Sequence, residues 1–182
     1  MTLLERLLAH LETLDSTRIL VCVDGPAGAG KTTLATELQS ALNHVEVIHM
    51  DDLYGGWDEP FSEDLAHRLM TQIRDPFLGN EPVSYSRFDW YASAFTSIVE
   101  VPSARILIVE GVGSAQRCMR ERAHVSVFID VAPSIGRDRV VTRDGAEVAA
   151  HIDAWQRAET AHFDADQTPT SVDIYVSRVE VE

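Results

Sequence analysis

Basic residues are scarce in this chain of 182 residues, which has 15 lysines and arginines against 29 aspartates and glutamates, a formal net charge of −14. Such an acidic protein is a poor candidate for non-specific binding to nucleic acids or anionic membranes, since both are negatively charged. We therefore expect no nucleic-acid partner and no membrane partner. Any anion that the chain binds must be held by local donors and not by the overall field.

Cysteines and long apolar runs are also lacking. Cys22 and Cys118 are the only cysteines, and two distant cysteines do not indicate a disulfide framework or a metal site. No run of about 18 apolar residues occurs, so the sequence predicts no membrane span. The first residues, MTLLERLLAHLETL, contain acids and no basic start, which is unlike a secretory signal. We expect a cytoplasmic protein.

Five short runs are rich in valine, isoleucine and leucine. They are RILVCV at 18–23, VEVIH at 45–49, RILIVE at 105–110, VSVFIDV at 125–131 and VDIYV at 172–176. Such runs are typical of strands buried on both faces, as in parallel sheets. Helical patterns occur at 3–14, 31–43, 62–73 and 146–163. The alternation predicts an α/β fold in which helices cover both faces of a five-stranded, mainly parallel sheet, giving three layers.

No linker, internal repeat or low-complexity tract interrupts this pattern, so we expect residues 1–182 to form a single domain. The least periodic part runs from Asp75 to Pro102 and is rich in aromatic and turn residues. We interpret it as a long irregular insertion, and for its part SYSRFDWY an irregular hydrophobic hairpin is the alternative to a ligand-binding role. Long irregular insertions in compact domains are more often functional than accidental.

The strongest motif is GPAGAGKTT, which follows the first predicted strand and opens a predicted helix. Gly25, Gly30, Lys31 and Thr32 satisfy the phosphate-loop (Walker A) pattern G-x-x-x-x-G-K-[ST]. Glycines let successive backbone N–H groups turn around a phosphate, and the helix N terminus adds partial positive charge. The pattern predicts nucleotide binding by the loop residues Gly25, Ala27, Gly28, Ala29, Gly30, Lys31, Thr32 and Thr33.

Acidic residues follow two other predicted strands. Glu110 ends the run RILIVE, and an acid at this place fits the magnesium side of a phosphate site, together with the hydroxyl of Thr32. Asp51 and Asp52 follow the run VEVIH. A carboxylate beside a phosphate donor has a use if it accepts the proton of a hydroxyl that attacks the phosphorus. We predict that one of the two aspartates has this role.

The phrases GPAGAGKTT, HMDDLYGGWD and IVEGV occur in this order, and over residues 18–145 the chain resembles the uridine kinase and nicotinamide riboside kinase group of P-loop kinases. The resemblance implies that Asp51 is the catalytic base and that Tyr54 lines the acceptor pocket. It also implies that Asp89, with Arg87 beside it in SYSRFDWY, binds the sugar hydroxyls. These residues belong to an acceptor-binding insertion over about 51–102.

A short lid over about 133–147 is implied by the same resemblance. Arg139 and Arg143 match its R-x-x-x-R-D pattern, and residues four apart share one face of a helix. Arginines that close on the transferring phosphoryl group neutralise developing charge. Lys31 reaches the β- and γ-phosphates from the loop. We therefore expect Lys31, Arg139 and Arg143 to act with Asp51 in catalysis.

The predicted function is ATP- and Mg²⁺-dependent phosphoryl transfer to a hydroxyl of a small molecule, with a nucleoside as acceptor. Two alternatives stay open. A cytidylate-like nucleoside monophosphate kinase would need arginines in the acceptor pocket, and Arg68, Arg74 and Arg87 are available for that role. A non-catalytic nucleotide-binding module is the other, although the absence of an N-K-x-D motif disfavours a GTPase switch. A homodimer is compatible with the sequence.

Overall fold

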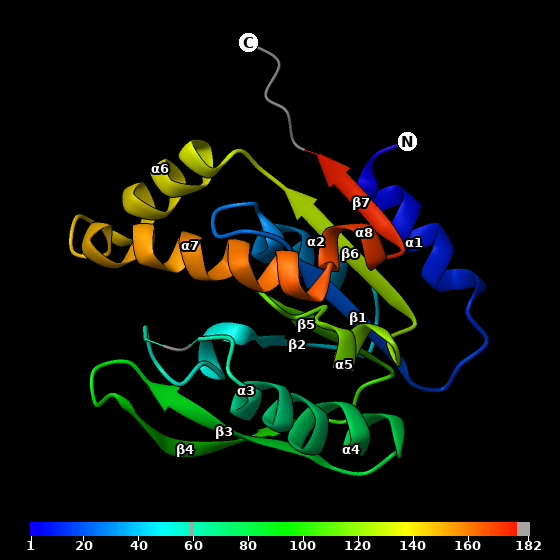
Figure 1. The fold of residues 1–182 in the computed structure, drawn as a ribbon. Coiled ribbons are helices and arrows are strands. Elements are labelled where there is room, and N and C mark those ends of the chain that lie inside the picture. Colours follow the sequence, from blue (N-terminus) through cyan, green and yellow to red (C-terminus); the bar gives the residue numbers. More distant parts are fainter. Residues whose placement is uncertain (59, 178–182) are drawn as a thin grey trace.

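A parallel five-stranded sheet forms the centre of the computed structural model, which describes residues 1–58 and 60–177 (Figure 1). The strands lie in the order β2-β5-β1-β6-β7, and each neighbouring pair is parallel. Their bounds are Ile19–Asp24 for β1, Val45–His49 for β2, Ile106–Glu110 for β5, Val125–Asp130 for β6 and Ile174–Ser177 for β7. All five predicted strands are present within two residues of their predicted bounds.

Helices cover both faces of the sheet, so the predicted three-layer α/β fold is confirmed (Figure 1). Alternate residues of β1 point to opposite faces: Val21 packs with residues of α1 and α2, and Cys22 packs with residues of α3, η2 and α7. The helices are α1 Leu3–Thr13, α2 Lys31–Ala41, α3 Glu63–Arg68, α4 Asp75–Leu78, α5 Arg117–Arg120, α6 Pro133–Asp144, α7 Ala149–Asp166 and α8 Thr168–Ser171, with short segments η1 Met50–Asp52 and η2 Leu69–Arg74. Among the described residues, no helix has the length and apolar character needed to cross a membrane.

The predicted helix over 62–73 is longer in the structure, because α3, η2 and α4 follow one another from Glu63 to Leu78. The middle segment η2 is a π-helix, whose turn is wider than that of an α-helix. From α3 to α4, buried residues recur at every fourth position, and this spacing is longer than the 3.6 residues of an α-helical turn. They are Leu65, Leu69, Ile73 and Phe77. The wider turn keeps these side chains facing the core.

The segment 75–102, expected to be an irregular insertion, contains a regular hairpin, and a hairpin is the alternative that the sequence left open for SYSRFDWY. Residues Val83–Asp89 form β3 and Ala94–Val101 form β4, and the two pair as an antiparallel hairpin beside the main sheet. Two features hide the hairpin in the sequence. A bulge between Arg87 and Phe88 breaks the alternation of apolar residues, and β4 buries almost none of its side chains.

The carboxyl ends of the five parallel strands share one edge of the sheet. From β1 the chain moves to β2 on one side, and from β5 it crosses to β6 on the other side of β1. In open α/β sheets, ligands bind at the edge where the strand order reverses in this way. The loops after β1, β2 and β5, with α6 after β6, therefore surround the expected position of a ligand.

Candidate active site

The phosphate loop joins β1 to α2, and its shape depends on glycine. Gly25, Gly28 and Gly30 have φ angles of +139°, +79° and +89°, a region that other residues rarely adopt. A Cβ atom on Gly28 would lie 2.3 Å from the carbonyl oxygen of Gly136 in α6. The loop thus keeps a tight curve in front of the N terminus of α2, a geometry suited to anion binding by backbone N–H groups.

Two of the predicted nucleotide-binding residues use their backbone N–H groups within the protein. The N–H of Ala27 donates to the carboxylate of Glu159 (3.0 Å), and the N–H of Ala29 donates to the carbonyl oxygen of Pro26 (3.2 Å). Ala29 is also fully buried. Both residues hold the curve of the loop, while their neighbours Gly28, Gly30, Lys31, Thr32 and Thr33 line the open space in front of it.

Lys31 is the only lysine of the chain. It is buried, and its Nζ donates to the carbonyl oxygen of Pro26 at 2.8 Å. Burial lowers the pKa of Lys31, against the opposing attraction of nearby carboxylates. An ammonium group that has already lost most of its water is ready to bind a phosphate without further desolvation.

Glu110 lies at the end of β5 and joins the loop to β2. Its Oε1 accepts from the hydroxyl of Thr32 at 2.9 Å and lies 2.5 Å from Nδ1 of His49. The hydrogen bond to Glu110 raises the pKa of His49. A hydroxyl and a carboxylate are the hard oxygen donors that Mg²⁺ prefers, so Thr32 and Glu110 fit this ion.

Histidine, cysteine and acidic side chains do not gather in threes at any potential metal site within residues 1–58 and 60–177. Mg²⁺ often takes most of its ligands from water and from substrate phosphates and only one or two from protein. The pair formed by Thr32 and Glu110 is compatible with such an ion.

The two adjacent aspartates after β2 have different surroundings. Asp51 faces the open space in front of the phosphate loop, whereas Asp52 accepts from the hydroxyl of Tyr85 at 2.9 Å. Asp51 is exposed to this space, but the protein around it displaces part of its water, and this desolvation raises its pKa. Glu110 acts in the same direction, while Lys31 lowers the pKa. A carboxylate with a raised pKa is a stronger base than an ordinary aspartate.

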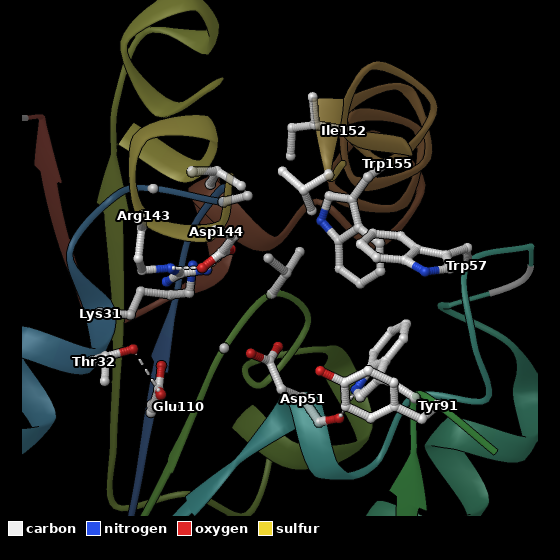
Figure 2. A pocket seen from close by; sticks show the side chains of 17 residues that line it. Lys31, Thr32, Asp51, Trp57, Tyr91, Glu110, Arg143, Asp144, Ile152 and Trp155 are labelled. Carbon is white, nitrogen blue, oxygen red and sulfur yellow. Dashed lines mark hydrogen bonds and ion pairs between the residues drawn. The ribbon is translucent and has the colours of Figure 1, made fainter. Parts of the chain in front are cut away.

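One cavity of about 480 Å³ brings some of the predicted residues together, among them Lys31, Asp51 and Arg143 (Figure 2). Lys31, Thr32 and Glu110 lie on one side, and Asp51 points into the space from below in this view. The opposite side consists of Trp57, Trp90, Tyr91 and Trp155, which we call the aromatic wall. The cavity therefore has a polar end at the phosphate loop and an aromatic end at the hairpin.

Ring contacts and one hydrogen bond order the aromatic wall. The ring centroid of Trp57 lies 4.9 Å from that of Trp90 and 5.7 Å from that of Trp155. The indole N–H of Trp90 donates to the backbone carbonyl oxygen of Asp51 at 3.0 Å. The hydrogen bond thus connects the aromatic wall to the segment that carries Asp51, and it holds that segment and the wall at a fixed distance from each other.

Three predicted substrate-binding residues do not line this cavity. Tyr54 is fully buried, and its hydroxyl donates to the carbonyl oxygen of Val112 at 2.8 Å. Arg87 is exposed on β3, just before the bulge. Asp89 accepts from the N–H groups of Tyr91 (2.9 Å) and Ala92 (3.0 Å), so it holds the hairpin turn as Asp residues often do. The residues after it, Trp90 and Tyr91, reach the cavity instead.

Both predicted lid arginines face the phosphate loop from α6. Arg139 donates to the carbonyl oxygen of Gly28 at 3.2 Å. Arg143 lines the cavity and forms two contacts of 2.6 Å with the carboxylate of Asp144. Both arginines also border a hollow of about 690 Å³ on the outer side of the loop. A phosphate chain bound to the loop would lie between α2 and these guanidinium groups.

The backbone of α6 touches the loop at Gly136, which leads to a prediction. A Cβ atom at Gly136 would lie 2.4 Å from the carbonyl oxygen of Ala27. Gly136→Ala should therefore push α6 away from the loop, weaken ADP binding and destabilise the fold by about 1–3 kcal/mol. Urea unfolding and ADP titration would measure both effects. Ser134→Ala, on an exposed position of the same helix, is the control and should leave both unchanged.

Two buried acids of the site were not predicted. Asp24 ends β1 and accepts from the N–H groups of Gly25 (2.7 Å), Gly113 (2.8 Å) and Ala115 (2.7 Å), so it joins the phosphate loop to the loop after β5. Glu159, in α7, accepts from Ala27. The sequence did contain a signal for Asp24, because this acid directly follows the apolar run RILVCV, just as Glu110 ends the run RILIVE. Nothing local distinguishes Glu159 from other acids of its helix.

Burial raises the pKa of Asp24 to about 6 and that of Glu159 to about 7, from ordinary values of 3.8 and 4.5. The folded state therefore keeps protons that the unfolded chain has already lost, and this contribution to stability falls as the pH rises from about 4.5 to 7. Glu159→Gln should remove the part of this pH-dependent loss of stability that comes from Glu159. Relative to this variant, the wild type should lose roughly 3 kcal/mol of unfolding free energy between pH 4.5 and pH 8.

Urea unfolding at several pH values would test this effect. Asp164→Asn, on an exposed position of the same helix, should follow the wild type at every pH. A constant difference between the wild type and Glu159→Gln across the range would contradict the raised pKa.

Comparisons with known proteins give a family and a fold. A sequence profile of the family described as AAA domain matches residues 21–160. Two curated proteins of Arabidopsis thaliana match part of the chain. Inorganic pyrophosphatase TTM1 is 30% identical over 122 residues, 61% of this chain and 18% of that protein, and inorganic pyrophosphatase TTM2 is 32% identical over 120 residues, with the same two shares. The matched region thus spans less than a fifth of the length of either relative.

Two solved structures have the same fold. One is described as a possible uridine kinase from Bacillus stearothermophilus, with a TM-score of 0.72, 18% identity and coverage of 95% of this chain and 96% of that chain. The other is described as a candidate fructose transport system kinase from Silicibacter sp. TM1040, with a TM-score of 0.68, 23% identity and coverage of 96% and 98%. The predicted resemblance to the uridine kinase-like group of P-loop kinases is confirmed in the fold.

Proposed function

Because the chain belongs to the AAA domain family and has the fold of P-loop kinases, we propose that it transfers the γ-phosphoryl group of ATP to a hydroxyl of a small molecule. A nucleoside is the proposed acceptor. One observation carries the proposal: Asp51 borders the same cavity as Lys31 and Thr32 of the phosphate loop. A proton acceptor and a phosphate cradle that share one space support transfer between bound ligands.

In this proposal, ATP binds with its phosphates in the loop from Gly25 to Thr33, in front of the N terminus of α2. Lys31 binds the outer phosphates, and Arg139 and Arg143 approach them from α6. Asp51 accepts the proton of the attacking hydroxyl. Positive groups placed where negative charge develops lower the barrier without reorganisation of solvent.

Mg²⁺ would be held by Thr32 and Glu110, directly or through water. When bound, the ion would supply positive charge that neutralises the charge developing on the phosphate oxygens during transfer. His49 contacts the same Oε1 of Glu110 as Thr32 does and so helps to fix the position of that carboxylate. Partners of this kind orient metal ligands and commonly affect metal affinity.

The other end of the cavity supports a nucleoside as the acceptor. The aromatic wall, together with Val112, Val148 and Ile152, offers flat and apolar surfaces to a planar ring. Asp51 lies beside this surface, on the side of the phosphate loop. A molecule with an aromatic base and a hydroxyl at the far end of a short sugar matches both parts, which favours a nucleoside over a purely polar acceptor.

A nucleoside monophosphate acceptor has less support. Arg68 donates to the carbonyl oxygen of Leu53, and Arg74 donates to that of Cys118. Neither they nor Arg87 line the cavity. An acceptor phosphate would have to share Arg143 with the donor nucleotide. We therefore rank the hydroxyl acceptor first, with the segment 51–102 as its binding insertion and 133–147 as the lid.

A screen of nucleosides, nucleoside monophosphates and simple sugars, with ADP release measured in the presence of ATP and Mg²⁺, would test the function. We expect release that depends on one nucleoside and requires Mg²⁺. Activity only with monophosphates would support the alternative kinase, and slow release independent of every acceptor would support a nucleotide-binding module. Pyrophosphate as sole substrate is a necessary control, given the names of the curated relatives.

A further inference from the structure

Glu159 receives two hydrogen bonds from opposite ends of the site. Its Oε2 accepts from the backbone N–H of Ala27 at 3.0 Å and from the indole N–H of Trp155 at 3.1 Å. Ala27 belongs to the phosphate loop and Trp155 to the aromatic wall, and both border the cavity. Glu159 itself is 3% exposed and does not line the cavity, so it lies behind the two groups that it holds.

Burial of a carboxylate lowers the stability of the folded state, so the buried position of Glu159 calls for an explanation. Taking it out of water destabilises the charged form unless donors replace the lost hydrogen bonds. Here the replacements are the two N–H groups and the attraction of Lys31. The buried indole N–H of Trp155 also depends on Glu159, since it would otherwise lack this partner, and the half-buried N–H of Ala27 would lose the same acceptor.

We propose that Glu159 is a positioning residue that couples the phosphate loop to the aromatic wall through a single carboxylate oxygen. A movement of Ala27 when phosphates enter the loop shifts Oε2 and, with it, the indole of Trp155. By reciprocity, a ligand that moves Trp155 changes the affinity of the loop for nucleotide. The proposal rests on the proposed function for the two half-sites, donor and acceptor, that this coupling joins.

Trp155 is well placed to transmit such a shift. Its ring makes edge contacts with Tyr54 (4.9 Å), Phe61 (5.4 Å) and Trp57 (5.7 Å) between ring centroids. Trp57 in turn contacts Trp90, whose N–H is bonded to the carbonyl oxygen of Asp51. A continuous series of contacts therefore runs from the loop, through Glu159, to the residue proposed as the base.

The test uses ADP with Mg²⁺ as the probe, so it does not depend on an acceptor. Glu159→Leu removes the acceptor of both hydrogen bonds, and Glu159→Gln keeps an oxygen for them. Trp155→Phe removes the indole N–H together with part of the ring that packs on its aromatic neighbours. We expect Glu159→Leu to weaken ADP binding roughly tenfold, in line with a lost hydrogen bond to a charged group. Glu159→Gln should restore most of the affinity. Asp164→Asn, exposed on the same helix, is the control.

The double variant decides whether the two contacts are coupled. Trp155→Phe should weaken ADP binding in the wild-type background but have no further effect when Glu159→Leu is already present. In NMR spectra, the indole N–H resonance of Trp155 should move when ADP binds to the wild type and stay still in Glu159→Leu. If Glu159→Leu does not fold, ADP titration compares Trp155→Phe with the wild type, and the indole N–H resonance of Trp155 is followed in Glu159→Gln, where it should still move when ADP binds.

Independent effects in the double variant, or an equal movement of the indole resonance in Glu159→Leu and the wild type, would overturn the coupling. So would unchanged ADP affinity in Glu159→Leu. Because every readout uses ADP, a failure of the acceptor screen would leave this result intact. Conversely, an active nucleoside kinase without the coupling would remove only the role of Glu159.

Discussion

Replacing Asp51 by asparagine should lower the rate of phosphoryl transfer by a factor of about 10²–10⁴, the usual contribution of a positioned base. Asparagine keeps the shape of the side chain but cannot take up the proton of the attacking hydroxyl. ADP affinity should stay close to the wild-type value, because the loop and its lysine are unchanged. Single-turnover kinetics with the acceptor found in the screen, together with ADP titration, would measure the two quantities.

Asp52 is the matched control for this prediction. It differs from Asp51 by one position, yet its carboxylate bonds to the hydroxyl of Tyr85 and does not line the cavity. Asp52→Asn should therefore keep most of the transfer rate. Equal losses in the two variants, or normal transfer by Asp51→Asn, would show that Asp51 is not the base.

Lys31→Met should reduce transfer even more, by roughly 10³–10⁵, the range known for cations that stabilise the transferring phosphoryl group. ADP binding should weaken as well, because the ammonium group binds the outer phosphates. The free protein should be as stable as the wild type or more so, since burial disfavours the charge of Lys31 and lowers its pKa. Kinetics and thermal unfolding without nucleotide would test both statements.

Arg137→Met is the control for the loss of one positive charge. Arg137 lies on the same helix as the lid arginines, but it pairs with Asp153 at 2.8 Å on the exposed side. This variant should change neither transfer nor ADP affinity by more than a small factor. A drop in stability for Lys31→Met, or transfer within tenfold of the wild type, would contradict the role assigned to the lysine.

The strands and the phosphate loop could be predicted because their signals are local. Apolar runs such as VSVFIDV define buried strands without reference to the rest of the chain, and the glycine pattern defines the loop together with its strand and helix. The same is true of Asp51 and Glu110, which follow directly after strands and so lie at the carboxyl edge of the sheet. Position in the chain was enough to bring them into one cavity.

Side-chain direction at the acceptor end could not be predicted in this way. Tyr54 and Asp89 were expected in the cavity, but the turn after η1 points the tyrosine into the core, and the hairpin turn uses the aspartate as a cap. The position of Asp89 depends on the hairpin, whose bulge and exposed strand conceal it in the sequence. The position of Tyr54 depends on Val112 and Trp155, which are distant in the sequence. Glu159 depends on contacts between segments even further apart, since 132 positions separate it from Ala27.

The single ammonium-bearing side chain of this protein lies at the bottom of its nucleotide site. Reagents that acylate amines thus have one side-chain target, and its lowered pKa leaves more of the reactive, neutral form than an ordinary lysine would offer. The extent of acylation at Lys31, measured separately from that of the α-amino group, reports how much of the loop is free. For the same reason, a dye or support attached through Lys31 would block the phosphate loop.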